Sequence, residues 1–434
     1  MQNTDLIQRT HAVVWHPCTQ MKEQQATPPL AIARGNGVWL YDTAGKPYLD
    51  GISSWWVNLF GHADPRINAA ICDQLARIEH VMLAGCTHEP VVALSESLVA
   101  LTGLDHVFYG SDGASATEIA LKMSFHYWHN CGQTDKTEFI SVKQGYHGET
   151  LGALSVTDVA IFKDVYAPLL RHSTQMMSPD WRLAEPGESH EQYALRAADD
   201  LAALLQRQHA RVAAVIVEPL VQAAAGMAMH HPAYLRRVRQ LCDEYGVHLI
   251  ADEIAVGFGR TGTMFACEQG DIKPDLMCLS KGITGGYLPL SAVLASDTIY
   301  RAFYADTTAR GFLHSHSYTG NPLACRAALA TLAIFESDKV LANNLMKAEY
   351  LDVAAATLRG HERVNHFRRT GMIWAFDVND AGPEFSRDFY LAALTQGVLL
   401  RPIGNTVYFM PPYVITEAEI DHLLGGALVA LNTA

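Results

Sequence analysis

Two residues of this chain stand where an amine and a carboxylate can act together. Asp252 ends the apolar segment VHLIAD, and Lys281 follows the next apolar segment, DLMCLS. In an open parallel sheet, ligands bind outside the carboxyl ends of the strands, so neighbouring strand ends can face one ligand. A lysine that forms an imine and a carboxylate that keeps a pyridine nitrogen protonated are what pyridoxal phosphate (PLP) chemistry needs. We therefore predict that Lys281 and Asp252 are catalytic and bind PLP.

A lone lysine is ordinarily a surface cation, but Lys281 lies between an apolar segment and the glycine-bearing turn GITGG. Other residues near strand ends suit the remaining parts of PLP. The segment GSDGASATEI offers the N–H groups of Gly113 and Ala114 at a helix start for the phosphate, although S-x-x-E there is also a helix-capping pattern. Tyr146 can stack on the cofactor ring. Glu218, at the end of VIVE, can hydrogen-bond near the ring.

The loop FLHSHSYTGNPLAC carries hydroxyl and imidazole groups that suit a phosphate. We predict that His316 and Ser317 bind the cofactor and that Ser315 contacts the substrate. Zinc held by His314 and His316 is the alternative, but no third ligand stands at a suitable spacing. We predict no metal site.

The surrounding elements must bring these residues together. From about residue 107, short apolar segments alternate with helical spacing, which indicates an α/β lobe with a mostly parallel sheet and helices on both faces. We assign a large domain to residues 61–330 and a small α+β domain to 331–434, to which 1–60 contribute, with a hairpin at 36–50. Helical spacing extends over 64–101, and the polar segment 172–195 is predicted to be a surface excursion.

The composition limits the classes of function. A length of 434 residues suggests two or three lobes, at roughly 100 to 200 residues each. The net charge of −13 argues against a nucleic-acid partner. The sequence has no signal-peptide pattern and no apolar run of about 18 residues, so we expect a cytoplasmic protein without membrane contact. Eight cysteines without a C-x-x-C pattern are expected to be buried thiols.

The blocks LIADEIAVGFGRTG and SKGITGGYLPLSAVL resemble the cofactor motif of the class-III PLP-dependent aminotransferases of fold type I. The resemblance runs over nearly the whole chain. It implies a seven-stranded type of central sheet and a homodimer with active sites at the subunit interface. Each partner would lend its His316–Ser317 loop to the phosphate of the other.

The segments VWHPCTQM, DGISSWW, GYHGET and RPIGNTVYFMPPY are similar to the members of this family that serve biotin synthesis. This implies transamination of 8-amino-7-oxononanoate, usually with S-adenosylmethionine as the amino donor. The acceptor has a carboxylate and a long chain, which need an arginine and an apolar wall. We expect Arg401 and Trp55 in these roles. Arg260, in GFGRTG, is expected to help place the substrate, which also contacts Tyr146 and Lys281.

The sequence departs from the family pattern at two positions. Cys18 stands where some members have a tyrosine that is associated with substrate recognition, and we expect Cys18 to contact the substrate. The aromatic wall near the amino group must be partly rebuilt here, or the donor pocket is different. Ser317 stands where other members have threonine, which keeps the hydroxyl group.

Several alternatives remain open. Another class-III aminotransferase acting on diamines, β-alanine or 4-aminobutyrate would have the same cofactor residues, and lysine can replace S-adenosylmethionine as the donor. A PLP mutase has the same fold. A non-catalytic binding module would be expected to lack Lys281 or Asp252, and the chain has both.

Overall fold

The computed structural model describes residues 3–434, which form two compact units. Unit 1 contains the chain up to Pro65, Asn344–Arg368 and Trp374–Ala434, and unit 2 contains Arg66–Asn343 and Arg369–Ile373. Residues 331–343 belong to unit 2 rather than to the small domain, because helix α11 (Pro322–Ser337) runs across the boundary drawn from the sequence.

A seven-stranded sheet forms the centre of unit 2, in the order β4-β12-β11-β10-β7-β5-β6. Its strands are β4 (His106–Gly110), β12 (Ser291–Ala295), β11 (Leu276–Leu279), β10 (His248–Asp252), β7 (Val212–Val217), β5 (Glu138–Val142) and β6 (Thr174–Met176). Strand β12 is antiparallel to both neighbours, and all other neighbouring pairs are parallel. The predicted α/β class with a mostly parallel sheet is confirmed.

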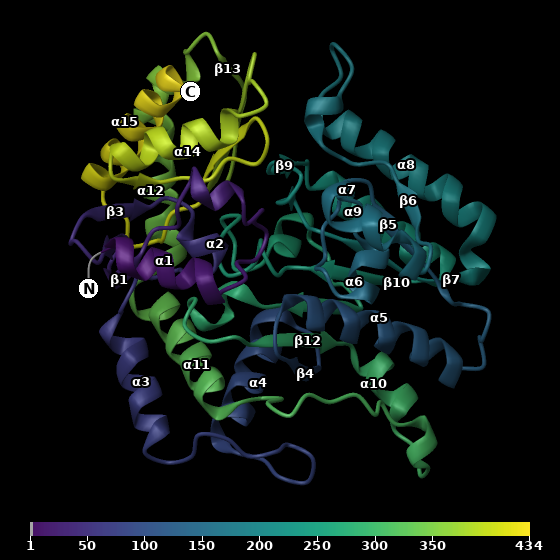
Figure 1. Ribbon diagram of the computed structural model, residues 1–434. Helices are drawn as coiled ribbons and strands as arrows, with labels where there is room; N and C mark the ends of the chain where they lie inside the picture. The colour runs from purple at the N-terminus through teal and green to yellow at the C-terminus, as the bar shows by residue number, and fades with distance from the viewer. Residues whose placement is uncertain (1–2) are drawn as a thin grey trace. The chain divides into compact units, whose positions relative to one another are not determined.

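Helices cover both faces of this sheet. Every residue of β7, β10, β11 and β12 is buried, as the unbroken apolar segments of the sequence require. Helix α5 (Gly113–Asn130) packs Ala116, Ile119 and Ala120 into the core beside the strands. Figure 1 shows α5 on one side of the strands and α8 (His190–Gln208) on the other, where α8 packs against α9 (Ala233–Tyr245).

The remaining elements of unit 2 are shorter or lie further from the strand ends. The helices are α3 (Pro65–Leu75), α4 (Glu89–Thr102), α6 (Leu151–Val156), α7 (Ala160–Lys163), α10 (Asp297–Phe303) and α11. Single 3-10 turns are η2 (Asp164–Leu169), η3 (Trp181–Leu183), η4 (His209–Arg211), η5 (Ala266–Gly270), η6 (Lys281–Thr284) and η7 (Thr308–Arg310), and β8 (Val221–Gln222) pairs with β9 (Ala228–Met229).

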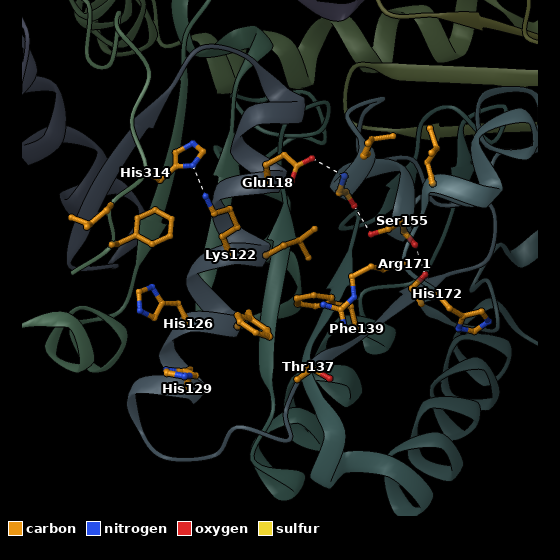
Figure 2. Close-up of a pocket in the computed structure, with 18 of the residues that line it drawn as sticks. Glu118, Lys122, His126, His129, Thr137, Phe139, Ser155, Arg171, His172 and His314 are labelled. Carbon is orange, nitrogen blue, oxygen red and sulfur yellow. Dashed lines mark hydrogen bonds between the residues drawn. The ribbon is translucent and has the colours of Figure 1, made fainter. Parts of the chain in front are cut away.

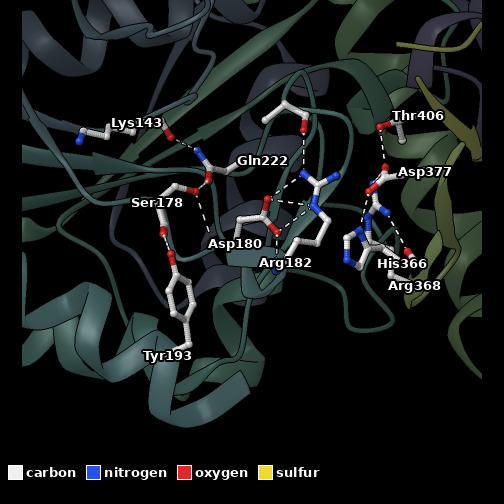
Figure 3. Close-up of polar contacts among 11 residues, drawn as sticks. Lys143, Ser178, Asp180, Arg182, Tyr193, Gln222, His366, Arg368, Asp377 and Thr406 are labelled. Atoms are coloured by element: carbon white, nitrogen blue, oxygen red, sulfur yellow. Dashed lines mark hydrogen bonds and ion pairs between the residues drawn. The ribbon is translucent and has the colours of Figure 1, made fainter. Parts of the chain in front are cut away.

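Two predictions about unit 2 are wrong in part. The helical spacing of 64–101 covers two helices, α3 and α4, with no helix over 76–88. The polar segment 172–195 contains the edge strand β6 and the buried Asp180, so it is not wholly a surface excursion. Asp180 is buried because its carboxylate accepts hydrogen bonds from the Arg182 guanidinium at 2.9 and 3.0 Å (Figure 3). A paired charge can be buried where an isolated one cannot.

Unit 1 contains two small sheets. The first has the order β1-β2-β3-β15 and the second β13-β14-β16. Their strands are β1 (Ile32–Asn36), β2 (Trp39–Asp42), β3 (Pro47–Asp50), β13 (Val364–Thr370), β14 (Ile373–Val378), β15 (Val398–Leu399) and β16 (Thr406–Phe409). Strands β2 and β3 form the predicted hairpin. In the second sheet the buried Arg368 pairs with Asp377 at 3.0 Å (Figure 3).

Unit 1 has the helices α1 (Asn3–Val13), α2 (Ser53–Trp56), α13 (Ala356–Arg359), α14 (Phe385–Thr395) and α15 (Glu417–Thr433), with one described 3-10 turn, η1 (Glu23–Gln25). Helix α12 (Val340–Ala354) begins in unit 2 and continues into unit 1 from Asn344. Within residues 3–434, the helices are all too short or too polar to span a bilayer. Four cysteines are buried, but Cys18, Cys72, Cys86 and Cys131 are exposed, because they lie on loops and helix surfaces rather than in the core.

Candidate active site

Three ionisable residues follow neighbouring strands of the unit 2 sheet. Asp252 is the last residue of β10, Glu218 comes directly after β7, and Lys281 comes two residues after β11. Strand β10 lies between the other two and runs parallel to both. The carboxyl ends of the three strands therefore bring these side chains to one edge of the sheet, as the sequence predicted.

Asp252 is buried and has a partner that the sequence did not reveal. Its Oδ2 atom lies 2.7 Å from Nδ1 of His147, and its Oδ1 accepts the backbone N–H of Ile254 at 3.1 Å. Burial alone would lower the pKa of His147, but the hydrogen bond to Asp252 and the charges of Asp252 and Glu218 raise it above the ordinary value. His147 stands next to Tyr146 in GYHGET, and that neighbour was the one available signal.

Glu218 forms hydrogen bonds with two loops of unit 2. Its carboxylate accepts the backbone N–H of Tyr146 at 2.9 Å and that of Ala223 at 3.1 Å. Burial raises the pKa of Glu218 to about 7, with the charge of Asp252 adding to the rise. Glu218 therefore contacts the loop that carries Tyr146. The Tyr146 hydroxyl donates to Glu149 at 2.9 Å, and Glu149 was not predicted from the sequence.

Lys281 has a backbone conformation that lysine rarely adopts. Its φ angle is +44°, in the left-handed region. Strain of this kind persists only where the surroundings impose it, and it concentrates at functional sites. Burial lowers the pKa of Lys281, while the charges of Asp252 and Glu218 oppose that effect. A lowered pKa leaves more of the amine neutral near neutral pH, which a proton-accepting or nucleophilic lysine requires.

The N-terminus of α5 has the features of a phosphate site. Asp112, rather than Ser115, is the N-cap: its carboxylate accepts the N–H of Ser115 at 2.8 Å. The predicted S-x-x-E capping alternative is therefore wrong, and Glu118 instead accepts the N–H of Gly152 in α6. The first N–H groups of a helix have no intrahelical acceptor, so those of Gly113 and Ala114 suit an anion.

The loop around His316 lies next to this helix start. The His316 ring nitrogen Nδ1 is 2.9 Å from the Ser111 hydroxyl of the same chain, while Ser315 and Ser317 are exposed. His316 also lies 3.3 Å from His314, whose other nitrogen lies 2.8 Å from Nζ of Lys122. Within residues 3–434, three or more histidine, cysteine, aspartate or glutamate residues nowhere gather in a metal-binding arrangement.

A cavity of about 760 Å³ lies beside the outer surface of α5 (Figure 2). Figure 2 shows Lys122, His126 and His129 of this helix along it, with Phe139 of β5 and His314 of the loop. Lys281, Asp252 and Glu218 do not line it. This cavity is therefore separate from the strand-end residues.

The predicted substrate residues of unit 1 form a group of their own. The Arg401 guanidinium lies 5.5 Å from the centre of the Trp55 ring, and its Nη2 donates to the carbonyl of Cys18 at 3.4 Å. Trp55 and Arg401 line a cavity of about 840 Å³ within this unit. Tyr390 and Tyr408 line the same cavity and were not predicted from the sequence.

Trp55 lies on an unusual turn. The four residues Ser53–Trp56 have φ angles of 52°, 46°, 70° and 73°. The left-handed conformation costs a residue with a side chain about 1–2 kcal/mol. Hydrogen bonds hold the turn: the Ser53 hydroxyl donates to the Met410 carbonyl at 2.7 Å, and the buried Asp50 carboxylate accepts from the Ser54 N–H at 2.9 Å and hydroxyl at 2.7 Å.

Arg260 is in unit 2, and its side chain is almost wholly buried at 1% exposure. The structure thus brings Arg260, Asp252 and Lys281 into one unit and Cys18, Trp55 and Arg401 into the other.

The unit 2 residues match the chemical parts of PLP. A lysine with a lowered pKa suits its aldehyde, a carboxylate held by His147 suits its ring nitrogen, and a helix start suits its phosphate. The GYHGET loop packs closely on this helix start, because a Cβ atom on Gly148 would lie 2.6 Å from that of Ala114.

Comparisons with known proteins identify the family of the chain. A model of the class-III aminotransferases matches residues 20–430. The adenosylmethionine-8-amino-7-oxononanoate aminotransferase of Helicobacter pylori is 44% identical over 96% of both chains. The crystal structure of the protein of that name from Methanocaldococcus jannaschii is 37% identical, with a TM-score of 0.94 over 99% of both chains. An omega transaminase from Pseudomonas jessenii in complex with PMP is 27% identical, with a TM-score of 0.93 over 98% of this chain and 97% of that one. The chain therefore belongs to the class-III aminotransferase family, whose cofactor is PLP.

Proposed function

We propose that this enzyme transfers an amino group to 8-amino-7-oxononanoate to form 7,8-diaminononanoate in biotin biosynthesis, with S-adenosylmethionine as the donor. The observation that carries the proposal is the match to relatives of that name over 96% of both chains, with Lys281 and Asp252 at neighbouring strand ends. Bound PLP supplies an electron sink for the carbanion that forms at the substrate carbon. The roles of the residues follow from their surroundings.

Lys281 would hold PLP through Nζ, and the same Nζ, as a free amine, would move a proton to and from the substrate carbon. Its burial favours the neutral amine that accepts this proton. Asp252 holds the positive charge of the ring nitrogen. The N–H groups of Gly113 and Ala114 bind the phosphate, and Tyr146 covers the ring.

Unit 1 binds the part of the substrate that does not react. Arg401 pairs with the carboxylate of 8-amino-7-oxononanoate, and Trp55 contacts its chain. The cavity of about 840 Å³ that these residues line has room for substrates of this size. The backbone carbonyl of Cys18 accepts a hydrogen bond from the Arg401 guanidinium. Arg260 and Ser315 remain proposed substrate contacts.

We further propose a cytoplasmic homodimer in which His316 and Ser317 of each subunit contact the phosphate of the other. Leu151, Leu169 and Leu313 line the unit 2 cavity of Figure 2 and are 51%, 66% and 79% exposed, which suits a surface that a second copy covers. The eight cysteines form no disulfide, which suits a reducing compartment.

The test is a donor and acceptor screen with the PLP-loaded enzyme. S-adenosylmethionine, lysine, a diamine and 4-aminobutyrate are each offered as donors to 8-amino-7-oxononanoate, and 7,8-diaminononanoate is measured by mass spectrometry. We expect the product with S-adenosylmethionine. Product with lysine alone would correct the donor. Absence of the product with every donor, together with turnover of 4-aminobutyrate and another keto acid, would assign a different class-III reaction.

A further inference from the structure

His147 is a buried histidine that directly contacts the carboxylate proposed to face the ring of PLP. Its side chain has no exposed surface, and its Nδ1 lies 2.7 Å from Oδ2 of Asp252. It also holds a fixed place in the GYHGET loop, because its backbone N–H donates to the Thr157 hydroxyl at 3.0 Å. The loop thus fixes both the backbone and the ring of His147 against Asp252.

The second ring nitrogen of His147, Nε2, indicates which residue the ring serves. Nε2 is buried, and no described residue forms a hydrogen bond with it. The nearby Gln222 amide is occupied, because its Oε1 accepts from Ser178 at 2.6 Å and its Nε2 donates to the Lys143 carbonyl at 2.9 Å (Figure 3). Among the described residues, the His147 ring therefore forms a hydrogen bond with Asp252 alone.

The charge of Asp252 needs such a partner. A buried carboxylate loses its hydrogen bonds to water, so donors of the protein must replace them. Without such donors the Asp252 carboxylate would not be held toward the ring nitrogen. The charged and titratable groups around His147 are Asp252, Glu218 and, through Asp252, Lys281. The His147 ring donates a hydrogen bond to the Asp252 side chain.

We propose that His147 is a positioning residue that orients the Asp252 carboxylate through its Nδ1–H, so that Asp252 can hold the protonated ring nitrogen of PLP. This inference rests on the proposed role of Asp252. The role of His147 goes beyond that proposal, because PLP binding through the ring nitrogen then depends on a residue that does not contact the ring.

The experiment measures how much binding the ring nitrogen supplies. The apoenzyme is titrated with PLP and with 1-deazapyridoxal phosphate, which lacks this nitrogen, and the ratio of the two dissociation constants is the readout. His147→Phe removes the donor, His147→Gln moves it away from the Nδ1 position, and His147→Asn keeps an N–H near that position. If His147→Phe does not fold, His147→Gln carries the test.

We expect a preference for PLP in the wild type that falls by about tenfold in His147→Phe and His147→Gln, and by less than about threefold in His147→Asn. His248→Asn is the matched control. His248 is buried at the start of β10, about 13 Å from Asp252 by strand geometry, and contacts the Ser124 hydroxyl at 2.9 Å. This variant should lower the melting temperature and leave the ratio unchanged.

Three outcomes would overturn the inference. They are an unchanged ratio in His147→Phe and His147→Gln, an equal fall in His147→Asn, and an equal fall in His248→Asn. The variant Asp252→Asn shows whether the role of His147 alone is wrong or whether the proposed role of Asp252 is wrong as well. If Asp252→Asn loses the preference while the His147 variants keep it, only the role of His147 is wrong. If Asp252→Asn keeps the preference, Asp252 does not face the ring nitrogen and both proposals fail.

Discussion

The residues of unit 2 that we propose for the cofactor and those of unit 1 that we propose for the substrate are positioned in different ways. Lys281, Asp252 and Glu218 follow regular parallel strands, so the order of the sheet places them at one edge. Trp55 lies on a turn of four left-handed residues, which distant groups such as Asp50 and the Met410 carbonyl hold in place. The first site depends on the topology of a whole sheet, and the second depends on a few hydrogen bonds.

The two regions also differ in burial. Asp252 and Glu218 are 4% and 6% exposed, and burial changes the pKa of Glu218 and of Lys281. Trp55 is 45% exposed, and Arg401 is exposed as well. A buried, prearranged site suits a cofactor that stays bound. An open cavity suits substrates that must enter and leave.

The largest expected effect is on the unit 2 site. Lys281→Ala should lower kcat by at least about 10⁴-fold, because the anchor and the acid–base group are lost together. Steady-state turnover is the measurement, and Lys143→Ala, an exposed lysine of the same unit, is the control. Multiple turnovers at a near wild-type rate would remove Lys281 from the centre of the site.

Asp50→Ala tests whether the unit 1 turn depends on its hydrogen bonds. Removing this buried carboxylate leaves the Ser54 N–H and hydroxyl without their acceptor, so we expect a loss of about 2–4 kcal/mol in the free energy of unfolding. The KM for 8-amino-7-oxononanoate should rise about tenfold as Trp55 shifts, while the affinity for PLP is kept. Denaturant unfolding and KM measure the two effects. An unchanged KM would separate the turn from substrate binding.

Arg401→Ala sharpens the comparison, because it changes a side chain without disturbing the turn. We expect the KM for 8-amino-7-oxononanoate to rise about 10- to 100-fold, because a charge-assisted hydrogen bond to its carboxylate is lost. The affinity for PLP should stay the same. Arg387→Ala is the control, since Arg387 lines the same cavity but pairs with Asp388 at 2.9 Å. If both variants raise KM equally, Arg401 is not the specific carboxylate partner.

Glu218→Gln should have the smallest effect. It removes a charge near Lys281 and one of the two oxygen atoms that accept the Tyr146 and Ala223 N–H groups. The Glu218 charge raises the pKa of Lys281, so removing it should lower that pKa further. Lys281 then becomes neutral at a lower pH, and the rising limb of the pH profile of kcat should move to lower pH. A shift to higher pH would show that Glu218 does not act on Lys281 through its charge.

Much of the unit 2 site could be predicted from the sequence. The apolar segments before Glu218, Asp252 and Lys281 predict strands, and parallel strands share a carboxyl edge, so their joint position followed from local patterns. His147 could not be predicted as the partner of Asp252, because 105 residues separate the two and the contact depends on how the GYHGET loop packs. The buried Asp180 was missed for a similar reason, since its arginine partner makes a polar segment compatible with burial.

The sequence by itself determined the fold class, the family and the strand-end positions of Lys281 and Asp252, because hydrophobic patterns and motifs are local. Only the tertiary structure decided which group contacts Asp252, which residue caps α5, and how Trp55 is held. Those features arise where segments far apart in the sequence meet, and the energy of a buried hydrogen bond depends on both partners being in place. The left-handed turn at Ser53–Trp56 is the strongest case, since no local preference favours four such residues in succession.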